Sequence, residues 1–190
     1  MISLCPKPCK LINNFKDIMP LNEHIQNKKT QILNLWLQRL CDAYPEEGGR
    51  FFRQKKSEFS NPVGHNFRVG LENILDELMQ DKASEALTQY VDDIVRIRAV
   101  QGIPPSEAAC FPLELMPIIR QVLKKELKEP QAREELFNFQ EKLNDLTSLS
   151  LDLYVQCREY LWSKKASFMR DHTRKLLEKA DLIKEVPDNL

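Results

Sequence analysis

In this 190-residue chain, the residues whose type and surroundings point most clearly to a binding role are two arginines, Arg96 and Arg98. They lie among apolar residues of a helical pattern that ends at Gly102, just before Pro104 and Pro105. A guanidinium group in apolar surroundings needs a partner, because burial of an unpaired charge is costly. The two side chains point about 200° apart on a helix, so they cannot share one face. We therefore expect one arginine to pack inward, where it binds carboxylates or carbonyls, and the other to face outward.

The arginine pair has two interpretations. In the favoured one, the inward arginine forms an internal bridge, to Glu107 or Glu114, that fixes the turn. In the other, the pair recognises an anionic ligand or a carboxylate of a protein partner, because the planar guanidinium binds such groups in a bidentate manner. The candidate binding site then also contains Gln101, Ser106 and Glu107. Ser106 is further expected to cap the helix that follows the turn.

His65 lies in a patterned helical segment, shortly after the Asn61-Pro62 turn. A single axial histidine can hold a haem in a helical protein, although such a residue more often serves at the surface or at a cap. We expect no cofactor, with haem at His65 as the alternative. The sequence has no GxGxxG, P-loop, HExxH or GxSxG pattern and no set of cysteines and histidines with zinc-site spacing. We therefore predict no catalytic residues, no metal site and no enzymatic activity.

The charge balance narrows the classes of partner. Lysine and arginine together number 28, as do aspartate and glutamate, so the formal net charge is zero. A protein that mainly binds nucleic acid needs a basic surface, so this class is disfavoured. No apolar run approaches the roughly 20 residues that span a bilayer, and the N-terminus lacks the apolar segment of a signal peptide. With five cysteines in no regular framework, the chain is predicted to be cytoplasmic.

The order of patterns along the chain predicts an all-α bundle of about five to six helices. Residues 1–20 have the prolines and polar residues of a tail, residues 21–165 carry helical spacing of apolar residues, and residues 166–190 form a C-terminal helical extension. Asn61 is expected to cap a helix that has Pro62 at its first position. No strand pattern with a period of two stands out.

The last helix carries apolar or small residues at alternating spacings of three and four, typical of a heptad seam. The seam residues that we expect to face a partner helix are Leu136, Phe139, Leu143, Leu146, Leu153 and Tyr160. In one interpretation, this is a core helix that stops near Lys165 and is followed by a break and a shorter helix. In the other, the helix projects and pairs with a second chain, which makes the protein a homodimer.

Several segments together resemble the RsbRD N-terminal domain family of RsbT co-antagonist proteins. The most specific one is Val95–Ala108, with the sequence VRIRAVQGIPPSEA; the others are Trp36, Tyr44-Pro45, residues 59–63 and residues 146–160. The similarity extends over about residues 25–165. Members resemble input modules of bacterial stressosome-type regulators, and related stressosome input domains are globin-like but lack haem. The resemblance implies an all-α sensory or interaction domain, which can be dimeric, in a bacterial cytoplasm.

The resemblance also implies how such a domain acts. In the related regulators, a helical input domain is followed by an output domain, often of the STAS type. Here only 30 residues follow Tyr160, fewer than a domain of that kind needs. We therefore expect a non-enzymatic regulatory module that works through contacts with another protein. The alternative is a sensor that binds haem, lipid or a metabolite inside the bundle, with Arg96 or Arg98 as the anion contact.

Overall fold

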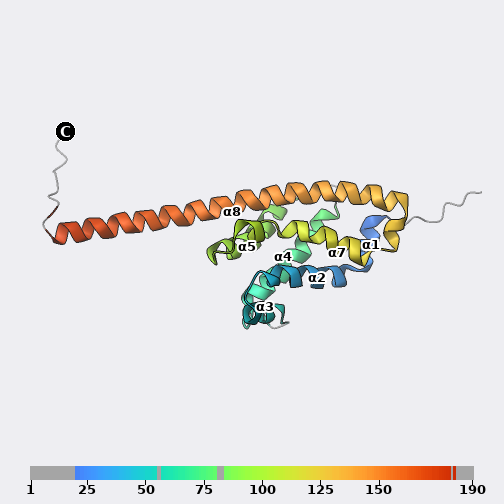
Figure 1. The fold of residues 1–190 in the computed structure, drawn as a ribbon, viewed down its shortest axis with the longest axis horizontal. Helices are drawn as coiled ribbons and strands as arrows, with labels where there is room; N and C mark the ends of the chain where they lie inside the picture. Colours follow the sequence, from blue (N-terminus) through green and yellow to red (C-terminus); the bar gives the residue numbers. More distant parts are fainter. Residues whose placement is uncertain (1–19, 55–56, 81–83, 181, 183–190) are drawn as a thin grey trace, which may run out of the picture.

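The computed structural model describes residues 20–54, 57–80, 84–180 and 182, and these residues form an all-α fold (Figure 1). The prediction of an all-α bundle with a long last helix is confirmed. The predicted tail lies outside the described residues except for Pro20. The α-helices are α1 (Leu21–Asn27), α2 (Lys29–Asp42), α3 (Glu46–Arg53), α4 (Pro62–Leu78), α5 (Ala86–Val100), α6 (Pro105–Ala108), α7 (Leu115–Val122) and α8 (Pro130–Lys179), with two 3-10 helices, η1 (Phe111–Glu114) and η2 (Glu126–Lys128).

The start of α4 follows the predicted capping chemistry. The side chain of Asn61 accepts a hydrogen bond from the backbone N–H of Gly64 at 3.0 Å, and Pro62 occupies the first turn, where a missing N–H costs nothing. The amide of Asn61 also donates to the carbonyl of Phe51 at 2.9 Å, which ties α4 to the end of α3. A side chain at Gly64 would meet the carbonyl of Phe52, so only glycine fits this contact.

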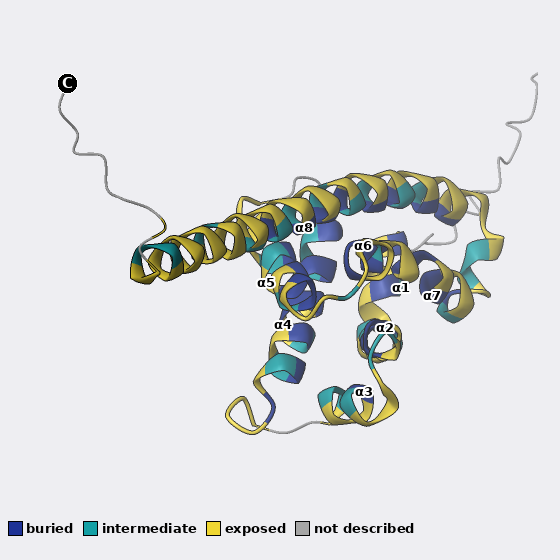
Figure 2. Cartoon of the chain, turned by 60° about the vertical axis from the view of Figure 1, so that its left-hand side comes forward, coloured by how far each residue is buried: buried dark blue, intermediate teal, exposed yellow. Residues whose placement is uncertain are grey.

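The helices form a globular body on one side of α8 (Figures 1 and 2). α5 packs against both α8 and α4, and α2 packs against α3, α4 and α7. The indole N–H of Trp36 donates to the carbonyl of Phe111 at 2.9 Å and fixes α2 to η1 in the middle of this body. The largest fully buried side chains are Trp36, Arg98, Phe67, Leu21, Ile25, Ile32, Leu71, Ile74, Leu75, Ile94, Leu115 and Ile118.

α8 is one helix of 50 residues, about 75 Å long at 1.5 Å per residue. It passes Lys165 without interruption, so the interpretation with a break at that point is wrong. Cys157 is the last buried residue, and no described residue after it is buried. The second half of α8 therefore projects from the body as an arm, which we define as residues 158–179 and which is visible at the orange-red end of Figure 1.

The predicted partner seam of α8 lies mostly inside the protein. Leu136, Phe139, Leu143 and Leu146 are buried in the hydrophobic core of the same chain, and Leu153 is partly buried against it. Only Tyr160 is exposed. This location corrects the prediction that these residues form a partner surface. The heptad spacing is satisfied within the chain, because α5, η1 and η2 pack on the seam.

Candidate functional site

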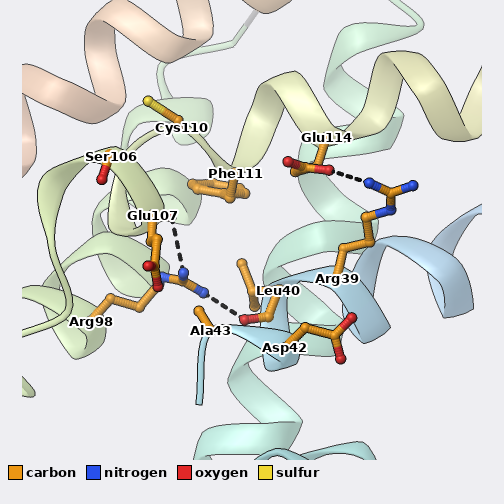
Figure 3. A pocket seen from close by; sticks show the side chains of 10 residues that line it. All are labelled: Arg39, Leu40, Asp42, Ala43, Arg98, Ser106, Glu107, Cys110, Phe111 and Glu114. Atoms are coloured by element: carbon orange, nitrogen blue, oxygen red, sulfur yellow. Dashed lines mark hydrogen bonds and ion pairs between the residues drawn. The ribbon is translucent and has the colours of Figure 1, made fainter.

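The buried side chain of Arg98 caps the C-terminal ends of two helices, α2 and α6 (Figure 3). Its side chain is 1% exposed, and its two terminal nitrogens donate to the carbonyls of Leu40, at 2.9 Å, and of Glu107, at 3.0 Å. These carbonyls belong to the last turns of α2 and α6, where backbone acceptors lack a partner within the helix and a positive charge is favourable. The internal bridge is therefore made, but to backbone carbonyls and not to the carboxylate of Glu107 or Glu114.

The surroundings of Arg98 are apolar and aromatic. Its guanidinium carbon lies 5.6 Å from the centre of the Tyr44 ring, a cation–π distance. Burial lowers the pKa of Arg98, an effect that nearby Tyr44, Cys41 and Glu107 oppose. Burial also raises the pKa of the Tyr44 phenol to about 12 and that of the Cys41 thiol to about 11. The Tyr44 phenol and the Cys41 thiol beside Arg98 thus stay neutral near pH 7.

The turn after α5 connects this site to α8. Gly102 adopts a left-handed conformation with φ of 76°, as glycine does where a helix ends. The hydroxyl of Tyr154 donates to the carbonyl of Ile103 at 2.9 Å, and the guanidinium of Arg158 donates to the carbonyl of Ala99 at 3.2 Å. Both side chains come from the part of α8 where the body ends and the arm begins. The turn is consequently held by Arg98 at one side and by the base of the arm at the other.

A surface pocket of about 340 Å³ lies beside Arg98, between α2, α6 and η1. An ion pair of 2.7 Å between Arg39 and Glu114 spans it from α2 to η1 (Figure 3). The pocket mixes charges of both signs, and its lining shows no arrangement of nucleophile, base and orienting group. The residues that line it are Arg39, Leu40, Asp42, Ala43, Arg98, Ser106, Glu107, Cys110, Phe111 and Glu114.

Comparison with models of known families gives one match. The model of the RsbT co-antagonist protein RsbRD N-terminal domain matches residues 30–167, most of the chain. The chain belongs to the RsbRD N-terminal domain family. This is a family of stressosome-type signalling input domains. Neither the curated proteins nor the solved structures gave a match. The matched range contains the Arg98 site, the turn after α5 and the start of the arm.

Two predicted site residues of this RsbRD domain lie away from Arg98. Arg96 points outward and pairs with Asp92 on the same helix at 2.7 Å, and His65 is half-buried on α4. Both line a second pocket, of about 380 Å³, between α4 and α5. The charged residues Glu58 and Asp93 share this lining, so the surroundings of His65 differ from the apolar enclosure of a haem. Five of the six predicted binding residues are thus divided between two pockets, and Gln101 lines neither of them.

The other predicted residues surround the turn of the RsbRD domain. Ser106 and Glu107 line the pocket beside Arg98, and Gln101 accepts a hydrogen bond from the Tyr44 hydroxyl at 2.8 Å. Ser106 does not cap α6, contrary to the prediction. The helix begins one residue earlier, with Pro105 in its first turn and Pro104 at the cap position, because proline is well suited to that first position.

The roles of Tyr154 and Arg158 in holding the turn were not predicted. Their partners are backbone carbonyls, which have no signal in a sequence. A signal does exist for Tyr154, since it follows the buried Ser150 by four residues and precedes the buried Cys157 by three. Within the described residues, no group of three or more His, Cys, Asp or Glu side chains is placed to hold a metal ion. No described helix meets the length and hydropathy of a membrane span.

Proposed function

We propose that this RsbRD domain is a non-enzymatic regulatory input module that acts through contacts between its α8 arm and other proteins. The observation that carries the proposal is the arm itself: it extends the core helix beyond the last buried residue and exposes large apolar side chains, including Trp162, Phe168 and Met169. Exposed apolar surface of this extent is typical of interaction sites.

The input end of the module is the Arg98 site. A ligand or protein that alters the pocket beside Arg98 acts on the carbonyl of Glu107 and so on α6 and the turn. At the base of the arm, Tyr154 contacts the turn and Arg158 contacts the last turn of α5. Because α8 is continuous, a small rotation at these residues becomes a large displacement at Lys179. Rigid helices convert local repacking into such motion.

Affinity capture tests the role of the arm. The whole chain is immobilised and exposed to a lysate of the cells that carry its gene, and bound proteins are identified by mass spectrometry. We expect a regulatory protein to bind the wild type and to be lost with Trp162→Glu, which places a charge in the apolar surface. Phe59→Glu is the matched control, because Phe59 is 97% exposed and lies outside α8. Identical sets of proteins on the wild type and on Trp162→Glu would contradict the proposal.

A small-ligand input is the second candidate, and the pocket beside Arg98 supports it. Its volume of about 340 Å³ falls within the range of small-molecule sites. Native mass spectrometry of the purified chain, compared with its denatured mass, tests this version. Extra mass in the native state is expected if a ligand is retained, and a Soret band would identify that ligand as haem. A native mass that equals whole multiples of 22.2 kDa would contradict a retained ligand.

A further inference from the structure

A second stripe of apolar residues runs along α8 on its exposed side. Phe137, Leu151, Val155, Trp162, Met169 and Leu176 are each between 44 and 66% exposed. We call these six residues the outer seam. At about 100° per residue they lie within one narrow strip, roughly a quarter-turn from the face that carries the buried Leu143 and Tyr154. The body therefore leaves this strip exposed along both the core half and the arm of α8.

Four of the six outer-seam residues are placed symmetrically about the Gln156–Cys157 peptide, near the middle of α8. Phe137 and Leu151 lie 14 residues apart in the first half, and Trp162 and Leu176 have the same separation in the second. When two copies of the helix run in opposite directions about the Gln156–Cys157 peptide, Leu151 of one meets Trp162 of the other. Phe137 then meets Leu176 in the same register.

The two halves of α8 carry opposite net charges. Residues 130–157 contain two basic and five acidic side chains, a net charge of −3, whereas residues 158–179 contain seven basic and three acidic ones, a net charge of +4. Two parallel helices would place like charges together along their whole length. Antiparallel helices place the acidic half of each copy against the basic half of the other, and such complementarity sets the orientation of a pair.

We infer that the outer seam binds the α8 helix of a second copy of this chain in an antiparallel arrangement. Leu151 then packs on Trp162 of the partner subunit, and Phe137 packs on Leu176 of the partner subunit. Since α8 joins the two bodies side by side along one helix pair, each arm lies against the core half of the other copy. This interface differs from the predicted seam, whose residues are mostly buried within one chain.

A basic arm with aromatic side chains also suits an anionic membrane or an acidic groove of another protein. Neither occupant accounts for the first half of the outer seam, because Phe137 and Leu151 lie among Glu134, Glu141 and Asp152, which outnumber the one basic neighbour, Arg133. An anionic surface would repel that half. A second copy of α8 is complementary to both halves at once, so it is the occupant that the charges favour.

The experiment combines oligomeric state with site-specific crosslinking. Sedimentation of the wild-type chain is expected to give twice 22.2 kDa, and Trp162→Glu is expected to weaken association by at least about tenfold, as loss of an aromatic anchor does. Phe59→Glu is the matched control and should associate as the wild type does. Salt at 1 M should weaken association, because the opposed charges are screened. A wild type that remains monomeric at 100 µM and low salt overturns the inference.

Orientation is tested with single cysteines in a background whose five native cysteines are replaced, after circular dichroism shows that the background folds. Phe137→Cys and Leu176→Cys should each fail to form a disulfide alone, while an equal mixture of the two variants should form a disulfide-linked pair. Disulfides in each variant alone would indicate parallel helices and overturn the inference. If the background does not fold, Phe137 or Leu176 of the wild type is replaced by a keto amino acid, to which a hydroxylamine spin label is attached without reaction at the native cysteines. A long distance between identical positions then indicates antiparallel helices.

This inference goes beyond the proposed function, because it assigns a second copy of the chain to the outer seam of the same helix. The two fail separately. A monomeric chain that still captures a protein through Trp162 overturns the antiparallel pair and leaves the proposed function standing. A dimer with the expected disulfides that captures no protein supports the pair and contradicts the proposed function.

Discussion

Replacement of Arg98 by alanine is expected to lower the free energy of unfolding by about 3–5 kcal/mol. The substitution leaves the buried carbonyl of Leu40 without a donor, at about 1–3 kcal/mol. It also removes the donor of the partly buried Glu107 carbonyl and opens a cavity beneath Tyr44. The ends of α2 and α6 lose their shared positive cap at the same time. Urea denaturation followed by circular dichroism measures the loss at pH 7.

Arg96→Ala is the matched control for this prediction, because it removes the same side chain two positions away on the same helix. Arg96 is exposed and pairs only with Asp92 in the contacts that the structure describes, an interaction of about 0.3–0.5 kcal/mol. Arg98→Lys should fall between the two, since one ammonium group cannot reproduce a planar fork that spans two helix ends. Equal losses for Arg98→Ala and Arg96→Ala would contradict the capping role.

The sequence predicts interactions within one turn of backbone better than it predicts which distant groups a side chain binds. Asn61 and Pro62 start α4 as expected, because both residues act on their own turn of backbone. The spacing of Arg96 and Arg98 requires one inward and one outward side chain, and the structure shows that the inward one is Arg98. The spacing could not name its acceptors. Backbone carbonyls are present at every residue, so only the assembled ends of α2 and α6 select those of Leu40 and Glu107.

The seam of α8 shows a second limit of sequence reasoning. Alternating spacings of three and four describe any helix that packs along one face, and they do not say whether the partner is another segment or another chain. In the fold, the predicted seam from Leu136 to Leu146 packs within the chain, while the outer seam has no regular heptad across Leu151 and Val155. From Val155 to Leu176 the outer seam has one apolar residue every seven positions and no large apolar residue three or four positions after each. A search for the alternating pattern therefore finds the first seam and passes over the second.

The two tryptophans give the second large prediction, because one is buried in the body and the other is exposed on the arm. Trp36 is 0% exposed, and its indole donates to the carbonyl of Phe111 at 2.9 Å. We expect Trp36→Ala to lower the free energy of unfolding by about 3–5 kcal/mol, from the cavity and the lost donor. Trp36→Phe retains most of the packing with Phe111 and should cost less than half of that.

Trp162→Ala is the matched control, since it removes the same side chain at a site that is 57% exposed. At protein concentrations where the chain is monomeric, it should change the free energy of unfolding by no more than about 0.5 kcal/mol. At higher concentrations, an antiparallel pair stabilises the wild type by mass action, so the difference between the wild type and Trp162→Ala should grow with concentration. Denaturation series at two concentrations measure both effects. If Trp36→Ala is as stable as Trp162→Ala, the prediction is contradicted, because the contact between α2 and η1 then contributes little to the free energy of unfolding.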